Sequence, residues 1–109
     1  MNALLLLTRP HADTEHLTVV GPLDRTTCRE FYDTASRLVA TSTDPRPLTV
    51  NLRCCTFVDD IGLEALDALG QLAEKRGHPL RLEAVPPLVE HLIRRHGESA
   101  ALLGALRGT

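Results

Sequence analysis

Hydrophobic and polar residues follow two different patterns along this chain, and their order predicts the fold. Short apolar or alternating runs, typical of strands, occupy residues 3–8, 17–20, 48–54 and 79–85. Apolar residues at helical spacing follow the last three runs, the longest of these segments extending from about Ile61 to Arg76. The order β-β-α-β-α-β-α predicts an α/β domain: a small mixed, mostly parallel sheet with helices mainly on one face.

The run 48–54 alternates strictly, so one face of the sheet should be packed and the other polar. Leu48, Val50, Leu52 and Cys54 are expected to point into the core, and Cys55 to point away from it. We expect one domain over residues 1–109, with its core in about 3–97 and a C-terminal helix or tail in 98–109.

Two features of the helical segments are not explained by core packing alone: a capping residue before the first helix and an unusually wide apolar arc on the second. Asp24 is placed to cap the first helix, because its carboxylate can accept hydrogen bonds from free amides of the first turn. In the helix 61–76, Ala65, Ala68 and Leu72 widen the apolar arc beyond one core contact. Packing against a neighbouring helix or the C-terminal tail would explain the wider arc, and so would a surface for a partner.

Composition excludes several classes of function. The net charge is −2 and the chain has only two Phe, one Tyr and no Trp, so neither a basic field nor a base-stacking surface for nucleic acid is expected. Three cysteines, two of them adjacent, do not form a closed disulfide set and favour a reduced, cytoplasmic protein. The apolar N-terminus lacks a basic leader and is too short to span a bilayer, so no membrane insertion is expected.

Catalytic and metal-binding patterns are not found in the sequence. His91 and His96 are five residues apart, a poor spacing for two ligands on one helix face, and the other histidines are expected at the surface. We find no glycine-rich phosphate loop, no CxxC pair and no Ser/His/Asp ordering. The protein is therefore expected to be no enzyme and to need no metal or cofactor.

The junction between the third strand and the next helix carries two adjacent carboxylates, Asp59 and Asp60. Helix capping by Asp60 explains one carboxylate, because a negative charge at a helix N-terminus is stabilised by the dipole. A phosphoacceptor site like that of response-regulator receivers is disfavoured. In those proteins the acidic pair follows the first strand and a lysine lies near the chain end, whereas the only lysine here, Lys75, is within a helix.

Phe57-Val58-Asp59-Asp60-Ile61-Gly62-Leu63 resembles the signature of STAS domains, the family of bacterial anti-sigma factor antagonists, in which an apolar strand end is followed by Asp-Ser-Ser/Thr-Gly-Leu. Val20-Gly21-Pro22-Leu23-Asp24 is similar to the family's Gly-x-Leu-Asp before its first helix. Gly77 to Val85 resembles the strand before its third helix. The resemblance covers about residues 3–97 and implies a non-catalytic module for protein–protein interaction in sigma factor signalling and transcription regulation.

The resemblance also assigns roles to individual residues. Asp59 matches the family's aspartate, Gly62 its glycine, and Asp24 an acidic residue near the phosphorylation site. Asp60 occupies the position of the serine that is phosphorylated by a kinase that is also the anti-sigma factor, and Ile61 replaces the second hydroxyl residue. Asp60 cannot be phosphorylated by a serine kinase, and its charge partly mimics the phosphorylated form, which in the family is released from the partner.

We therefore expect a docking surface on an anti-sigma factor or serine kinase-like partner, bound weakly, formed by Asp24, Asp59, Asp60, Ile61, Gly62 and Glu64. Thr56, the nearest hydroxyl, is expected to be poorly presented on the strand. Two alternatives stay open: a STAS domain that senses a small ligand through a pocket near Leu72, and a constitutive STAS subunit of a transporter-associated or other assembly.

Overall fold

A four-stranded mixed sheet forms the centre of the molecule. The computed structural model describes residues 5–10, 15–41, 46–96 and 100–106. The strands β1 (Leu5–Pro10), β2 (Glu15–Leu23), β3 (Leu48–Val58) and β4 (Leu80–Glu83) lie side by side in chain order. β1 is antiparallel to β2, whereas β2, β3 and β4 are mutually parallel neighbours. The predicted mixed, mostly parallel sheet is confirmed.

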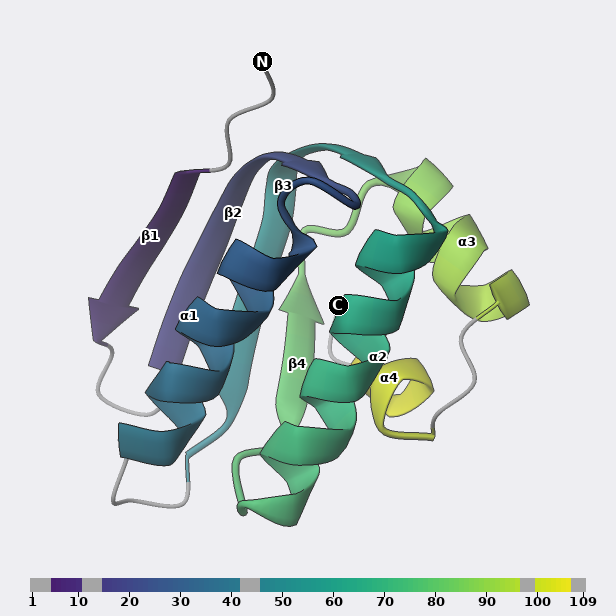
Figure 1. Ribbon diagram of the computed structural model, residues 1–109. Helices are drawn as coiled ribbons and strands as arrows, with labels where there is room; N and C mark the ends of the chain where they lie inside the picture. Colours follow the sequence, from purple (N-terminus) through teal and green to yellow (C-terminus); the bar gives the residue numbers. More distant parts are fainter. Residues whose placement is uncertain (1–4, 11–14, 42–45, 97–99, 107–109) are drawn as a thin grey trace.

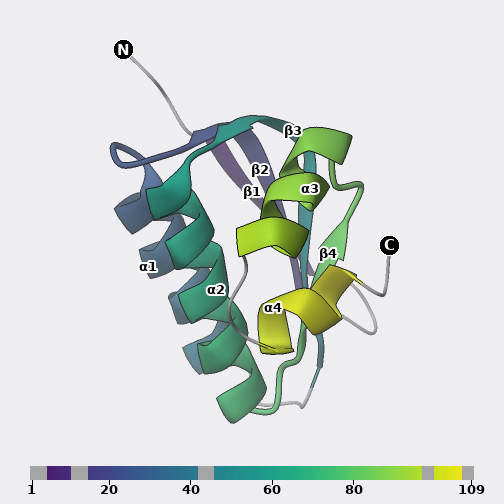
Figure 2. The ribbon, with the colours of Figure 1, turned by 90° about the vertical axis from the view of Figure 1, so that its right-hand side faces the viewer.

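Four helices accompany the sheet: α1 (Cys28–Thr41), α2 (Asp60–Lys75), α3 (Pro87–His96) and α4 (Ala100–Ala105). α1 and α2 lie side by side in front of the sheet and begin at the same edge, with α3 and α4 beyond α2 on the β4 side (Figure 1). The view turned by 90° places the helices on one side of the sheet (Figure 2). In the part of the chain that is described, no helix has the length and apolar character needed to cross a membrane.

The core lies between this face of the sheet and the helices. Buried side chains from the strands meet buried side chains from α1 and α2, as the two periodicities predict. α1 packs against one flank of α2 and α4 against the other, so α1 and α4 together cover most of the wide apolar arc of α2. Ala65 packs partly against the core, but Ala68 remains exposed. The fully buried large side chains are Phe31, Leu17, Leu23, Leu48, Leu52, Leu66, Leu69, Leu82, Ile93, Leu102, Val19 and Val50.

The expected orientation of the two adjacent cysteines is wrong. Cys54 is exposed and Cys55 is buried, because β3 carries an extra residue where the register against β2 shifts between Thr18 and Val20. A second shift follows between Gly21 and Pro22. Each extra residue reverses which alternate side chains face the core. Burial raises the pKa of the Cys55 thiol, so this cysteine is unreactive core packing.

The bounds of other elements also differ from the sequence expectation. β2 was expected to end at about residue 20 but continues through Gly21 and Pro22 to Leu23. The bulge between Gly21 and Pro22 allows the strand to accommodate these two residues. β4 ends earlier than predicted, since Ala84 has a positive φ of 53° that no strand can continue. His78, expected at the surface, is only 5% exposed and its Nδ1 lies 2.9 Å from the carbonyl oxygen of Arg46.

Candidate functional site

The C-terminal ends of β2 and β3 bring the two predicted acidic segments together. Leu23 pairs with Val58, so the chain leaves both strands at the same edge of the sheet. The amide of Asp59 donates a 3.3 Å hydrogen bond to the carbonyl oxygen of Leu23. Asp24 and the turn Asp59–Gly62, far apart in the sequence, are therefore neighbours, as the resemblance implied.

Asp59, not Asp60, caps α2, which corrects the sequence expectation. The backbone of Asp59 is extended (φ −102°, ψ −174°), and its Oδ1 accepts a 2.8 Å hydrogen bond from the amide of Gly62. Extended backbone followed by helical backbone, with a side-chain oxygen on the amide three residues later, is the geometry of an N-cap. Asp60 is the first helical residue, and its side chain is exposed.

Replacing Asp59 with alanine should lower the free energy of unfolding by about 1 kcal/mol, because the Gly62 amide loses its acceptor. Urea unfolding of Asp59→Ala and Asp59→Asn measures this. Asparagine keeps an oxygen at the same place, so Asp59→Asn should retain most of the wild-type stability. Equal losses in both variants would contradict a capping role.

Gly62 allows α2 to approach the end of β2. A Cβ atom built on Gly62 would overlap the carbonyl oxygen and carbon of Leu23. Glycine is therefore required by a close backbone approach and not by its φ angle. The same approach brings the first turn of α2 beside Asp24.

Asp24 caps the turn that leads into α1, as expected. Its Oδ1 accepts hydrogen bonds from the Thr26 amide at 2.9 Å and from the Thr26 hydroxyl at 2.6 Å, and its carbonyl oxygen accepts a 2.8 Å hydrogen bond from the amide of Cys28, where α1 begins. The hydrogen bond from the Thr26 hydroxyl is the main cause that holds the pKa of Asp24 below its usual value. Its carboxylate is thus negative at neutral pH, and its contribution to stability is lost as pH falls through this lowered pKa.

Two further side chains near the turn are exposed to solvent, which the sequence analysis did not predict. Phe57 is 53% exposed, and Thr56 is exposed although it was expected to be poorly presented. Alternation counted from Leu48 would point Phe57 outward, and it is correct at this position because the two extra residues in β3 cancel each other's effect. Leu88, in the first turn of α3, is the most exposed large apolar side chain described, at 68%.

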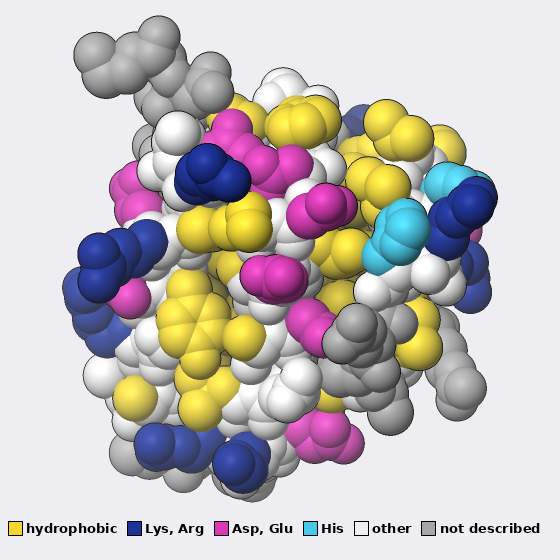
Figure 3. All heavy atoms as spheres, turned by 45° about the vertical axis from the view of Figure 1, so that its right-hand side comes forward, with side chains coloured by type: hydrophobic (Ala, Val, Ile, Leu, Met, Phe, Trp, Pro, Cys, Tyr) yellow, Lys and Arg dark blue, Asp and Glu magenta, His cyan; other side chains and the backbone are white. Residues whose placement is uncertain are grey.

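The surface of α2 is acidic toward its start. Asp60 and Glu64 are exposed, Asp67 is partly buried, and Ile61 is half-buried beside them. In Figure 3, acidic and hydrophobic side chains are intermixed over the upper and middle part of this face, a basic side chain lies beside them at the upper left, and further basic side chains lie toward the left, right and lower edges. Among the residues with described side chains, no group of three or more His, Cys, Asp and Glu residues could hold a metal ion. Such a surface is suited to docking through charge and apolar contact.

Comparison with known proteins identifies the architecture. A family model described as "Mlab, STAS domain" matches residues 7–104, nearly the whole chain. The chain belongs to the STAS domain family. An anti-sigma factor antagonist from Mycobacterium paratuberculosis is similar in structure, with a TM-score of 0.70, 21% sequence identity and coverage of 96% of this chain and 95% of that one. No curated protein matches the chain in sequence.

Two further solved structures are similar to the same degree. The phosphorylated form of the Bacillus cell fate determinant SpoIIAA has a TM-score of 0.67 at 16% sequence identity. The match covers 87% of this chain and 84% of SpoIIAA. The murine anion transporter Slc26a9 has a TM-score of 0.68 at 24% identity over 82% of this chain, which spans only 14% of the transporter. All three identities are below 25%, so these matches establish the STAS fold and leave partner and role open.

Proposed function

We propose that this STAS domain is a non-catalytic interaction module of the anti-sigma factor antagonist type, lying outside the usual phosphorylation switch. The proposed docking surface comprises the exposed Asp60 and Glu64 and the half-buried Ile61, with the exposed Phe57 as an apolar anchor beside it. Asp24, Asp59 and Gly62, expected as contact residues, instead support this turn from below, since Asp24 and Gly62 are buried and Asp59 caps α2. Aromatic side chains are enriched among the residues that dominate binding energy in interfaces. The proposed partner is an anti-sigma factor of the serine-kinase type.

The position of Asp60 carries this proposal. Asp59 does the capping, so Asp60 is not needed for that purpose. Asp60 makes no side-chain hydrogen bond or ion pair with another described residue, and it is exposed. Its negative charge at the mouth of α2 is therefore available to a partner and is stabilised by the helix dipole.

A fixed aspartate differs from a switchable serine in charge and in chemistry. Phosphoserine carries about −1.5 to −2 charges at neutral pH, whereas aspartate carries −1 in a smaller group. SpoIIAA, one of the similar proteins, has a phosphorylated form. A chain with Asp60 at the equivalent position would hold a partial copy of that state permanently, and its affinity for a kinase-type partner should be low.

Incubation with serine kinases and ATP should leave residues 56–62 unphosphorylated, because Asp60 and Ile61 offer no hydroxyl to a kinase. Intact-mass measurement followed by peptide mapping checks this. Thr56 is the one hydroxyl in this segment, and Thr56→Val is the matched control. Stoichiometric phosphate on the wild-type segment that disappears in Thr56→Val would contradict the proposal, since Thr56 would then replace the missing serine.

A constitutive subunit of a transporter-associated assembly is the second candidate function. The structural similarity to 14% of the murine anion transporter Slc26a9 favours it, because the matching segment there is part of the transporter chain itself. Purification of the tagged chain from its native cells separates the two candidates. A stoichiometric membrane-protein partner that survives high salt would support the transporter role, and a salt-sensitive kinase-like partner the antagonist role.

A further inference from the structure

A groove between the second half of α1 and the last turns of α2 lies at the opposite end of these helices from the proposed docking surface. Its volume of about 370 Å³ is within the range of roughly 300–1,000 Å³ that is typical of small-molecule sites. Both helices contribute to its lining, which includes Asp33, Ser36, Arg37, Val39, Leu72 and Arg76.

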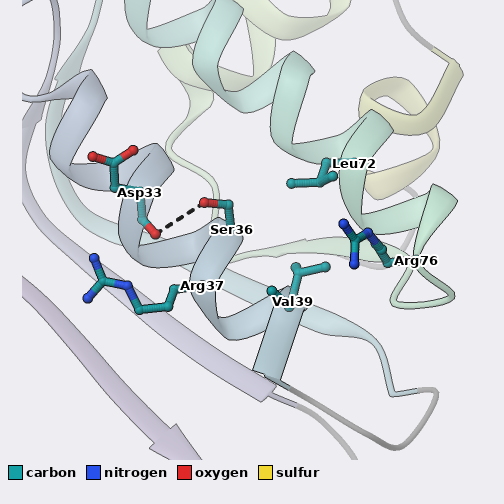
Figure 4. A pocket seen from close by; sticks show the side chains of 7 residues that line it. Asp33, Ser36, Arg37, Val39, Leu72 and Arg76 are labelled. Carbon is teal, nitrogen blue, oxygen red and sulfur yellow. Dashed lines mark hydrogen bonds between the residues drawn. The ribbon is translucent and has the colours of Figure 1, made fainter.

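The floor of the groove is apolar and is only partly covered by the fold. Val39 is buried and belongs to the core. Leu72 is half-buried, but it is neither in the core cluster nor among the partly buried side chains that pack against that cluster. In Figure 4, Leu72 and Val39 point into the groove from opposite helices. An apolar group placed between them would therefore cover surface that folding leaves accessible to water.

One of the charged groups that line the groove is directed across it. In Figure 4 the Arg76 guanidinium extends from α2 toward α1, whereas Arg37 lies on the outer side of α1 and the Asp33 carboxylate is turned away from Leu72 and Arg76. The Arg76 side chain forms no hydrogen bond or ion pair with another described residue. The groove therefore combines an apolar floor with one available guanidinium group.

The helix ends beside the groove would repel an anion less than bare helix ends would. The last carbonyl groups of a helix carry partial negative charge. At the end of α2, the amide of Arg76 donates hydrogen bonds to the carbonyl oxygens of Leu72 and Ala73, at 3.1 and 3.2 Å. At the end of α1, the Thr41 hydroxyl donates a 2.9 Å hydrogen bond to the carbonyl oxygen of Arg37. These carbonyl groups are thus partly satisfied, and the full charge of Arg76 is the stronger influence on a nearby ligand.

We propose that this groove binds a small amphiphilic oxyanion, a carboxylate or phosphate group attached to a short apolar chain. The planar guanidinium of Arg76 can hold either head group through two parallel hydrogen bonds. The chain lies between Leu72 and Val39. The Ser36 hydroxyl already donates to the carbonyl oxygen of Asp33 at 3.1 Å, so Arg76 is the group that selects an anion. The groove is remote from Asp60, so this ligand neither requires nor excludes the proposed partner.

A matched series of probes tests the charge and the chain of the ligand separately. In NMR titrations of the wild type, octanoate and octyl phosphate should shift the amide signals of residues 36–40 and 72–76. Their dissociation constants should be about 0.1–1 mM, as expected for ligands of about ten non-hydrogen atoms. Acetate, which lacks the chain, and octylamine, which has the opposite charge, should bind at least about tenfold more weakly, because each loses one of the two contacts. Tighter binding of octanoate or of octyl phosphate identifies the head group.

Two variants and one control assign the binding to the groove. Arg76→Gln removes the charge of an exposed side chain, and Leu72→Ala shortens the apolar floor, so each should weaken octanoate binding by about tenfold. Arg81→Gln removes an arginine from a different groove, between β4 and α4, and should bind octanoate like the wild type. The absence of amide shifts at these residues overturns the proposal. So does equal binding of octanoate and octylamine, or equal binding of octanoate by Arg76→Gln and the wild type.

Discussion

Gly62→Ala should destabilise the domain by about 3 kcal/mol, the upper part of the range for forcing extra volume into a packed site. The added methyl group would overlap the Leu23 carbonyl, which is backbone and cannot rotate away. The first turn of α2 would have to move from the end of β2, and the cap between Asp59 and the Gly62 amide would be strained. Urea unfolding at neutral pH measures the loss.

Gly70→Ala is the matched control, because it makes the same substitution two turns later in the same helix. A Cβ at Gly70 would meet its nearest atoms at 3.4 Å, which is ordinary van der Waals contact. Alanine also favours the helix by about 0.5–1 kcal/mol relative to glycine, so this variant should be as stable as the wild type or more so. Comparable losses in both variants would show that the approach at Gly62 is not specific.

Asp60→Ser with Ile61→Ser should strengthen binding to a kinase-type anti-sigma factor by about 1–3 kcal/mol, or roughly five- to 150-fold. The change removes a fixed negative charge at the contact and restores the two hydroxyl positions of the family pattern. Asp60 is exposed, and Ile61 is half-buried but outside the core cluster, so the two substitutions should alter the docking surface and leave the core intact. Titration of the partner with each protein measures the affinity.

Two variants separate charge from the hydroxyl group in this gain. Asp60→Asn removes the charge without adding a hydroxyl, so it should recover part of the affinity if charge is responsible. Glu74→Ser removes a negative charge from the flank of α2 near α4 and should change nothing. If the double variant binds no more tightly than the wild type, Asp60 does not limit docking.

Periodicity was sufficient to predict the architecture. The alternation of strands with helices predicted a mixed, mostly parallel sheet with helices on one face, and the structure has it. The orientation of Cys54 and Cys55 could not be predicted, because the two bulges depend on how β3 fits against β2. A strand's own alternation contains no signal for an extra residue in its pairing.

The candidate site was predicted only in part. The resemblance led to Asp24 and the turn at Asp59–Gly62, which the ends of β2 and β3 bring together. It could not distinguish which aspartate caps α2, since that depends on where the backbone becomes helical.

Calorimetric titration of a purified serine-kinase anti-sigma factor with the wild-type chain tests the central claim most directly. If Asp60 permanently copies the phosphorylated state, the dissociation constant should be weaker than about 1 μM even when the kinase has no ATP. Tight binding, with a constant near about 1 nM, would show that the fixed charge at the start of α2 does not oppose docking, and the account would be wrong.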